Sequence, residues 1–152
     1  MKREYFKSQA LRTVGLVAGV AAVVGVLSTP VFADSTVKVG LWDKSDGSQG
    51  INLSAAEVKA GKVTFEVTNL SKNKEHEFMI LKTDMTTKQF PMNSTKSRVD
   101  EDKIPAMHEF GDVEEGETKS WSTELTPGRY VLFCNEPGHF PAGMHTTMMV
   151  TP

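Results

Sequence analysis

Cysteine is almost absent from this sequence, and so is any large excess of charge of one sign. The chain has 152 residues, one cysteine and a formal net charge of -2. A single cysteine excludes an internal disulfide framework. The balanced charge excludes the basic surface that a nucleic-acid-binding protein uses to neutralise phosphates. Hydrophobic residues make up 39% and charged residues 24%, which is typical of a globular domain and not of a multi-span membrane protein or a disordered chain.

Long hydrophobic runs are also missing, with one exception near the N-terminus. Val14 to Leu27 contains only valine, glycine, leucine and alanine, follows several basic residues and precedes small residues that end at Ala33. This pattern predicts a signal peptide over residues 1–33, cut after Ala33. The weaker alternative is an uncleaved anchor, because a helix of this length rises about 21 Å and the hydrocarbon core is roughly 30 Å thick. We therefore expect residues 34–152 to form one periplasmic, monomeric domain without a membrane span.

Export makes the single cysteine informative, because a free thiol is a liability in an oxidising compartment. Cys134 has four possible roles. It can pair with another chain, be buried and inert, act as a nucleophile or bind a metal.

Alternating apolar and polar residues predict strands along most of the exported part. In residues 36–41 and 62–68, every second residue is apolar. Further runs of strand character cover residues 76–81, 118–125, 129–134 and 146–150. Short alternating runs separated by turn residues indicate an all-β sandwich or barrel.

Two segments depart from the strand pattern. Residues 55–59 are compatible with a single helical turn, and residues 84–110 form a long polar stretch that contains Met85, Met92 and Met107. A connection this long in a small domain is usually functional or ordered by short helices of its own. We expect a long loop or a short helical insertion at about residues 84–110.

The residues that carry chemistry lie near the C-terminus, where Cys134, His139 and Met144 follow one another at the spacing C-x4-H-x4-M. Thiolate and thioether are soft ligands that select copper, and imidazole accepts both copper oxidation states. A trigonal site of two imidazoles and one thiolate with a weak axial methionine needs a second histidine, and His76 supplies it. Taken singly, His76 can be a packed histidine and Met144 a core residue, but the combination predicts a copper site.

Residues 129–145 resemble the copper-binding loop of the cupredoxins, or blue copper proteins, and are most similar to the loops of their rusticyanin and azurin branches. The similar features are Tyr130 before Cys134, Pro137-Gly138-His139 and Gly143-Met144. Residues 61–65 and 76–78 are also similar to a group of exported bacterial cupredoxin-like copper-binding proteins. The resemblance covers nearly all of residues 36–151. It implies a Greek-key β-sandwich with one type 1 copper ion, whose ligands are His76, Cys134, His139 and axial Met144.

One position departs from that resemblance. Electron-transfer cupredoxins commonly have asparagine or serine directly after the first histidine ligand, and this chain has Glu77. A carboxylate there is expected to change the hydrogen bonding around the site and to lower its reduction potential.

Other residues near the motif have weaker claims. His145 is expected to point away from the copper, because it directly follows Met144. His108 and the three loop methionines are candidates for an auxiliary copper(I) site. Phe140 and Pro141 are candidates for an apolar rim at which a redox partner docks.

These observations favour electron transfer between redox partner proteins. The alternative is copper buffering, delivery or tolerance, with a copper donor or acceptor protein as partner. An enzyme is not expected. A second copper centre needs more histidines or another cysteine, and a Cys134–His139 nucleophilic pair leaves His76 and Met144 unexplained. Zinc can occupy the same ligands, but the thioether favours copper.

Overall fold

The computed structural model describes residues 34–104 and 106–152. The predicted signal peptide, residues 1–33, lies outside the described residues. Within them, regular structure consists of strands and two short 3-10 turns, η1 (Thr87–Gln89) and η2 (Glu101–Lys103). None of the described helical segments is long and apolar enough to cross a membrane. The strands are β1 (Ser35–Asp43), β2 (Gln49–Leu53), β3 (Glu57–Lys59), β4 (Gly61–Asn69), β5 (His76–Lys82), β6 (Met92–Asn93), β7 (Arg98–Val99), β8 (His108–Val113), β9 (Thr118–Leu125), β10 (Gly128–Phe133) and β11 (His145–Thr151).

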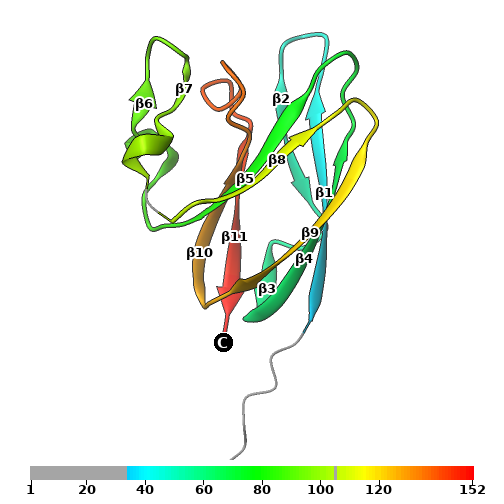
Figure 1. The fold of residues 1–152 in the computed structure, drawn as a ribbon, viewed down its shortest axis with the longest axis vertical. Coiled ribbons are helices and arrows are strands. Elements are labelled where there is room, and N and C mark those ends of the chain that lie inside the picture. The colour runs from blue at the N-terminus through cyan, green and yellow to red at the C-terminus, as the bar shows by residue number, and fades with distance from the viewer. Residues whose placement is uncertain (1–33, 105) are drawn as a thin grey trace, which may run out of the picture. The chain divides into compact units, whose positions relative to one another are not determined.

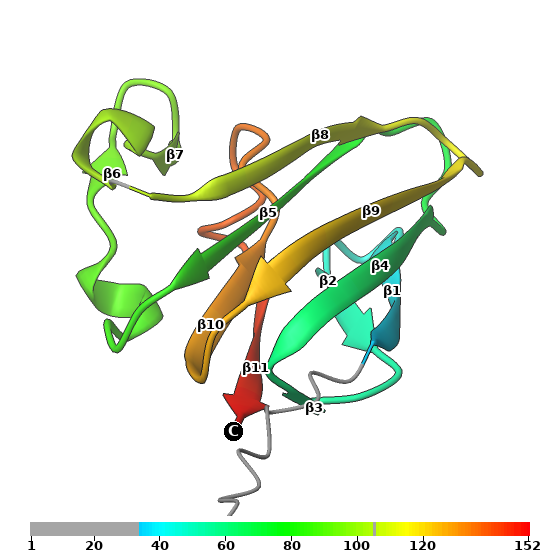
Figure 2. The same ribbon diagram turned by 60° about the horizontal axis from the view of Figure 1, so that its bottom comes forward.

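Two sheets face each other and form a sandwich (Figures 1 and 2). The first has the strand order β2-β1-β4-β9, and the second has the order β3-β11-β10-β5-β8. The pairs β1–β4 and β3–β11 are parallel, and the other neighbouring strands are antiparallel. The expected all-β sandwich is therefore confirmed.

The apolar faces predicted by alternation meet in the core between the sheets. On β4, Val63, Phe65 and Val67 are completely buried, while the residues between them are more exposed. Phe65 packs edge-on against Phe78 of the opposite sheet, with ring centroids 5.5 Å apart. Burying a side chain of this size stabilises the fold by about 1.5–3 kcal/mol.

Two parts of the sequence prediction need correction. The helical turn expected over residues 55–59 is wrong, because Glu57–Lys59 form β3 and pair with Met149–Thr151 of β11. A three-residue strand is too short to show a period, and its partner strand determines its conformation. Strands β2 and β8 were not predicted from the sequence. Each contains a glycine, Gly50 or Gly111, and glycine weakens the strand signal.

The segment from residue 84 to residue 107, called the excursion below, covers the outer face of the second sheet. It contains η1, the small β6–β7 hairpin and η2, and it stands beside β5 in Figure 1. Short helical turns were expected here and are present, but residues 108–110 belong to β8. The excursion covers the outer face of β5, and the inner face packs in the core between the sheets, so His76 to Leu81 are all buried. Its apolar contacts with the sheet form a second core cluster of Met79, Leu81, Phe90, Val99, Ile104, Val131, Phe133 and Phe140.

Candidate metal centre

Three of the predicted ligands meet at one end of the second sheet. His76 is the first residue of β5, Cys134 directly follows β10, and His139 lies in the loop between β10 and β11. Cys134 Sγ is 3.3 Å from His139 Nδ1 and 3.8 Å from His76 Nδ1, and the two Nδ1 atoms are 3.2 Å apart. Bonds from zinc to nitrogen and sulfur ligands are about 2.0–2.3 Å long. Donor atoms at such distances from one ion lie roughly 3.5 Å from one another. The three donor atoms therefore fit a single metal ion.

The loop that carries the C-terminal ligands is closed by its own backbone. Cys134 N–H donates to the Met144 carbonyl at 3.1 Å, and Met144 N–H donates to the His139 carbonyl at 3.0 Å. Gly138 and Gly143 have φ angles of +87° and +101°, which a residue with a Cβ rarely adopts. Met144 is completely buried in the same core cluster as Cys134. The loop thus ties the backbone of the predicted axial residue to two other predicted ligands.

A chain of polar contacts fixes the ring of His76. Ser71 Oγ lies 2.7 Å from His76 Nε2, and both residues are buried. Ser71 also donates a hydrogen bond to Asp43, which forms an ion pair with Lys74 at 2.5 Å. Because the Ser71 hydroxyl proton points to Asp43, its oxygen accepts the Nε2 proton of His76. The lone pair of Nδ1 then faces Cys134 and His139, as metal binding requires.

Burial keeps the three donors uncharged in the absence of a cation. It raises the pKa of the Cys134 thiol to about 12. Burial and the neighbouring His139 lower the pKa of His76 to about 4. A metal cation reverses the balance at the thiol, since a coordinating cysteine loses its proton. The site is therefore suited to neutral imidazoles and to a thiolate formed when metal binds.

Asn135, which the sequence analysis did not single out, fastens the ligand loop to the excursion. Its side chain accepts a hydrogen bond from Val99 N–H at 2.8 Å and donates to the Val99 carbonyl at 3.2 Å and to Glu101 Oε1 at 2.6 Å. Gly138 N–H donates to the Ser97 carbonyl at 2.8 Å. The only available signal was its position directly after Cys134, because its partners lie about 36 residues earlier.

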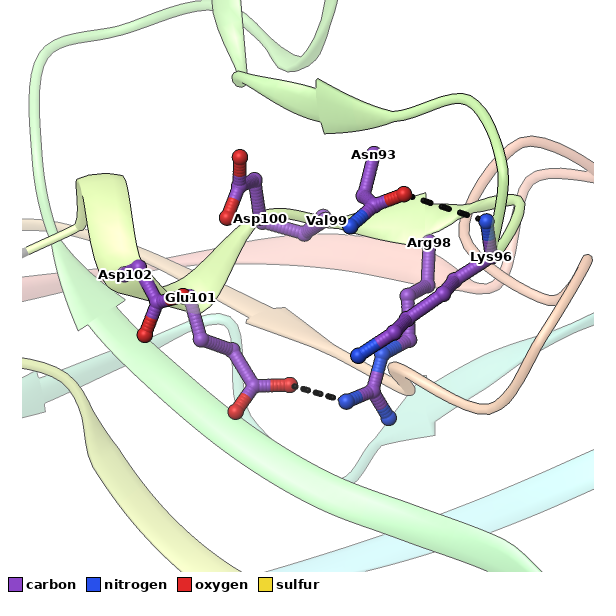
Figure 3. A pocket seen from close by; sticks show the side chains of 7 residues that line it. All are labelled: Asn93, Lys96, Arg98, Val99, Asp100, Glu101 and Asp102. Atoms are coloured by element: carbon purple, nitrogen blue, oxygen red, sulfur yellow. Dashed lines mark hydrogen bonds and ion pairs between the residues drawn. The ribbon is translucent and has the colours of Figure 1, made fainter.

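Figure 3 shows a polar pocket in the excursion. It lies next to the hydrogen bonds that Asn135 makes with Val99 and Glu101. The Glu101 and Arg98 side chains point toward each other and form an ion pair at 3.6 Å. The pocket has a volume of about 140 Å³, and its other lining residues are Asn93, Lys96, Val99, Asp100 and Asp102. Arg98 pairs with Glu101, and Glu101 in turn accepts a hydrogen bond from Asn135, so these two charged residues of the pocket support the attachment of the ligand loop.

The expected departure at Glu77 places a carboxyl group on the outer face of β5, opposite Asp112 of β8. Glu77 is only 8% exposed. Burial and the neighbouring acidic side chains raise its pKa to about 7. It is therefore a buried acid next to a predicted ligand.

The weaker candidates lie outside the three-donor cluster. His145 is half-buried and packs against Phe140 with ring centroids 5.1 Å apart. His108 is exposed on β8 and stacks on Phe110. Met85 and Met107 pack against the second core cluster, whereas Met92 is 40% exposed. These different surroundings give no support to an auxiliary copper(I) site around His108.

The expected apolar rim is only half present. Phe140 is 4% exposed and packs against Phe90 and Phe133 of the second core cluster. Pro141 remains exposed. Phe140 therefore anchors the ligand loop to the excursion and does not contribute to a docking surface.

Comparison with known proteins identifies the fold. No protein-family model matches the sequence, and no curated protein matches it. Among solved structures, rusticyanin from Thiobacillus ferrooxidans is 18% identical, with a TM-score of 0.56 over 77% of each chain. Auracyanin B is 21% identical, with a TM-score of 0.58 over 82% of this chain and 93% of its own. Both the architecture and the placing of the His-Cys-His cluster agree with the resemblance seen in the sequence, and the chain has the cupredoxin fold.

Proposed function

We propose that this protein is a periplasmic type 1 copper protein that binds one copper ion and carries single electrons between redox partners. The observation that carries the proposal is the triangle of His76 Nδ1, Cys134 Sγ and His139 Nδ1, with sides of 3.2–3.8 Å. These three residues and axial Met144 are the proposed ligands. One thiolate, two imidazoles and a thioether form the donor set that favours copper over zinc or iron.

Copper, when bound, supplies a one-electron redox couple, and the chain supplies a rigid and dry surrounding for it. His76 and Cys134 lie on β5 and at the end of β10, which are neighbouring strands of one sheet. Both residues and Met144 are completely buried, which excludes water. His139 is half-buried and lies nearest to solvent among the proposed ligands. A fixed geometry that changes little between copper(I) and copper(II) suits rapid electron transfer.

The decisive measurement is the visible absorption spectrum of the purified protein after one equivalent of copper(II), followed by reductive titration. We expect an intense thiolate-to-copper band that disappears on reduction and returns on oxidation. Cys134→Ser should remove the band, and the exposed Met149→Leu serves as the matched control. Met144→Leu should keep the band and raise the reduction potential, because a weak donor to copper(II) is lost. A strongly coloured Cys134→Ser protein contradicts the ligand assignment.

Copper handling is the second candidate, and one feature of the loop surface favours it. Met92 and His145 line a pocket of about 340 Å³ together with Phe140 and Pro141, next to the ligand loop. A thioether and an imidazole are suitable transient ligands for copper(I). If delivery is the function, the protein stays colourless, holds copper(I) and passes it to a chelator. Met92→Leu should then slow the transfer at least several-fold, and unchanged transfer argues against a role for this pocket.

A further inference from the structure

The end of the sandwich that carries the proposed copper ligands also carries a cluster of lysines. Figure 1 shows the turn after β1, the loop after β4 and the ligand loop at this same end. The turn and the loop after β4 line a pocket of about 540 Å³. The part of this lining called the lysine surface consists of Asp43, Lys44, Leu70, Lys72 and Lys74.

The lysine surface has more positive than negative charge. Lys74 forms an ion pair with Asp43. Lys44 and Lys72 take part in none of the ion pairs among the described residues. The turn also contains Asp46, but this residue does not line the pocket. The excess of positive charge is notable on a chain whose formal net charge is -2, and it is suited to an acidic partner.

Leu70 gives the lysine surface an apolar centre. Its side chain is 58% exposed, more than any other large apolar side chain of the described residues. An exposed apolar group with a charged rim is typical of a surface at which another protein docks. Phe140, the candidate for such a rim on the ligand loop, is buried and does not take this role.

Polar contacts connect the lysine surface to a proposed copper ligand. Asp43 accepts a hydrogen bond from Ser71, and Ser71 Oγ lies 2.7 Å from His76 Nε2. The charges of Lys74 and Asp43 also act on His139. A protein docked on the lysine surface is therefore separated from His76 only by the side chains of Asp43 and Ser71.

We propose that the lysine surface docks a redox partner protein through carboxylates on the partner's own surface. This inference rests on the proposed electron-transfer function and names the chemistry of the partner. Attraction between lysines and carboxylates raises the rate of encounter and orients the partner. The carboxylates of Glu75, Asp112 and Glu136 lie together near β8 of the other sheet, where they repel an acidic protein and direct it to the lysine surface.

Nuclear magnetic resonance of the metal-free protein tests the surface without any need for copper, with an octaglutamate peptide as the probe. We expect saturable shift changes at the backbone amides of residues 44–47 and 70–74, which become smaller as salt is added. The double variant Lys44→Gln with Lys72→Gln should bind the peptide roughly fivefold more weakly, since exposed ion pairs are individually weak. Lys62→Gln changes an exposed lysine at the opposite end of β4, and this matched control should bind as the unchanged protein does.

Two results of this titration overturn the proposal. One is equal binding by the double variant, or shift changes spread over exposed lysines throughout the molecule. The other is a dependence of the same amide shifts on protein concentration without the peptide, because a second copy of this chain then occupies the lysine surface.

Stopped-flow oxidation of the copper(I)-loaded protein connects the surface with electron transfer. Hexacyanoferrate(III) is the anionic oxidant, and one electron passes from copper(I) to iron(III), which leaves copper(II) and iron(II). The double variant should react several-fold more slowly than the unchanged protein at low ionic strength. With the cationic oxidant tris(phenanthroline)cobalt(III), it should not be slower.

Equal rates with hexacyanoferrate(III) in the double variant and the unchanged protein overturn the docking role, even if the peptide binds. A protein that binds the peptide at the lysine surface but binds no copper contradicts the proposed function, while the surface for an acidic protein stands. The two failures are therefore distinguishable.

Discussion

Ser71 shows how much a proposed copper ligand depends on a residue outside the donor set. Its hydroxyl is 2.7 Å from His76 Nε2 and links that ring to Asp43 and Lys74. Ser71→Ala leaves a buried N–H without its partner, which costs about 1–3 kcal/mol of stability. It also frees the ring to rotate, so copper affinity should fall roughly 10–100-fold. Competition with a copper chelator measures the affinity, and urea unfolding measures the stability.

The control for Ser71→Ala is Ser45→Ala at an exposed position in the turn after β1. If both variants bind copper as tightly as the unchanged protein, the Ser71 contact does not orient His76.

Glu77 gives a pH dependence whose sign can be worked out. Burial, with Glu101, Glu109, Asp112 and Glu136 nearby, raises its pKa from 4.5 to about 7. The folded protein therefore binds the proton more tightly than the unfolded chain does. This stabilising contribution is complete below pH 4.5 and is lost as the pH rises through about 7. Glu77→Gln should thus gain stability relative to the unchanged metal-free protein between pH 4.5 and pH 7.

Urea unfolding of both metal-free proteins at several pH values measures that difference. His76 titrates in the same range with the opposite sign, because its pKa is lowered from 6.5 to about 4, but it is present in both proteins and cancels. If the stability difference between the two proteins does not change with pH, the pKa of Glu77 is not raised in the folded protein.

Sequence reasoning at the scale of single residues found the proposed ligands but not the residues that hold them. Cys134, His139 and Met144 lie on one loop, so their spacing alone predicted that they would meet. Ser71 and Asn135 act through contacts that exist only after the strands pair, such as that of Asn135 with Val99, and no local pattern marks them.

At the scale of elements, hydrogen bonds from the excursion hold the ligand loop in place. Asn135 bonds to both backbone groups of Val99 and to Glu101 in a buried environment. Asn135→Ala leaves those two backbone groups without partners, each worth about 1–3 kcal/mol. We expect a loss of roughly 2 kcal/mol or more in the free energy of unfolding, and faster amide hydrogen exchange at Val99.

The matched control is Asn52→Ala on β2, an exposed position away from the excursion. Unchanged exchange at Val99 in Asn135→Ala would show that the apolar cluster alone holds the excursion in place.

Strand prediction succeeded where one face of a strand is buried and failed elsewhere. β4 alternates strictly because its other face meets solvent, and β9 was predicted with its exact bounds, Thr118–Leu125. β5 does not show a solvent-exposed face, because the excursion covers the face that points away from the core. The three residues of β3 take their conformation from β11, which is information that the sequence does not hold locally.

At the scale of the whole molecule, a bound copper ion would join parts of the chain that are far apart in sequence. His76 and Cys134 are separated by 58 positions, and His76 and His139 by 63. Because the unfolded chain does not hold these donors together, copper should bind the folded state far more tightly and stabilise it. At a free copper concentration a hundredfold above the dissociation constant, the expected gain is about 2.7 kcal/mol.

Calorimetry of metal-free and copper-loaded protein measures this gain as a rise in melting temperature of several degrees. Cys134→Ser should lose most of it, since the thiolate is the donor that favours copper most strongly. Met149→Leu should keep the full gain in melting temperature, because Met149 is 43% exposed on β11, whereas the proposed ligand Met144 is buried. A gain of equal size in Cys134→Ser would mean that copper stabilises the protein without the Cys134 thiolate, which contradicts the proposed ligand set.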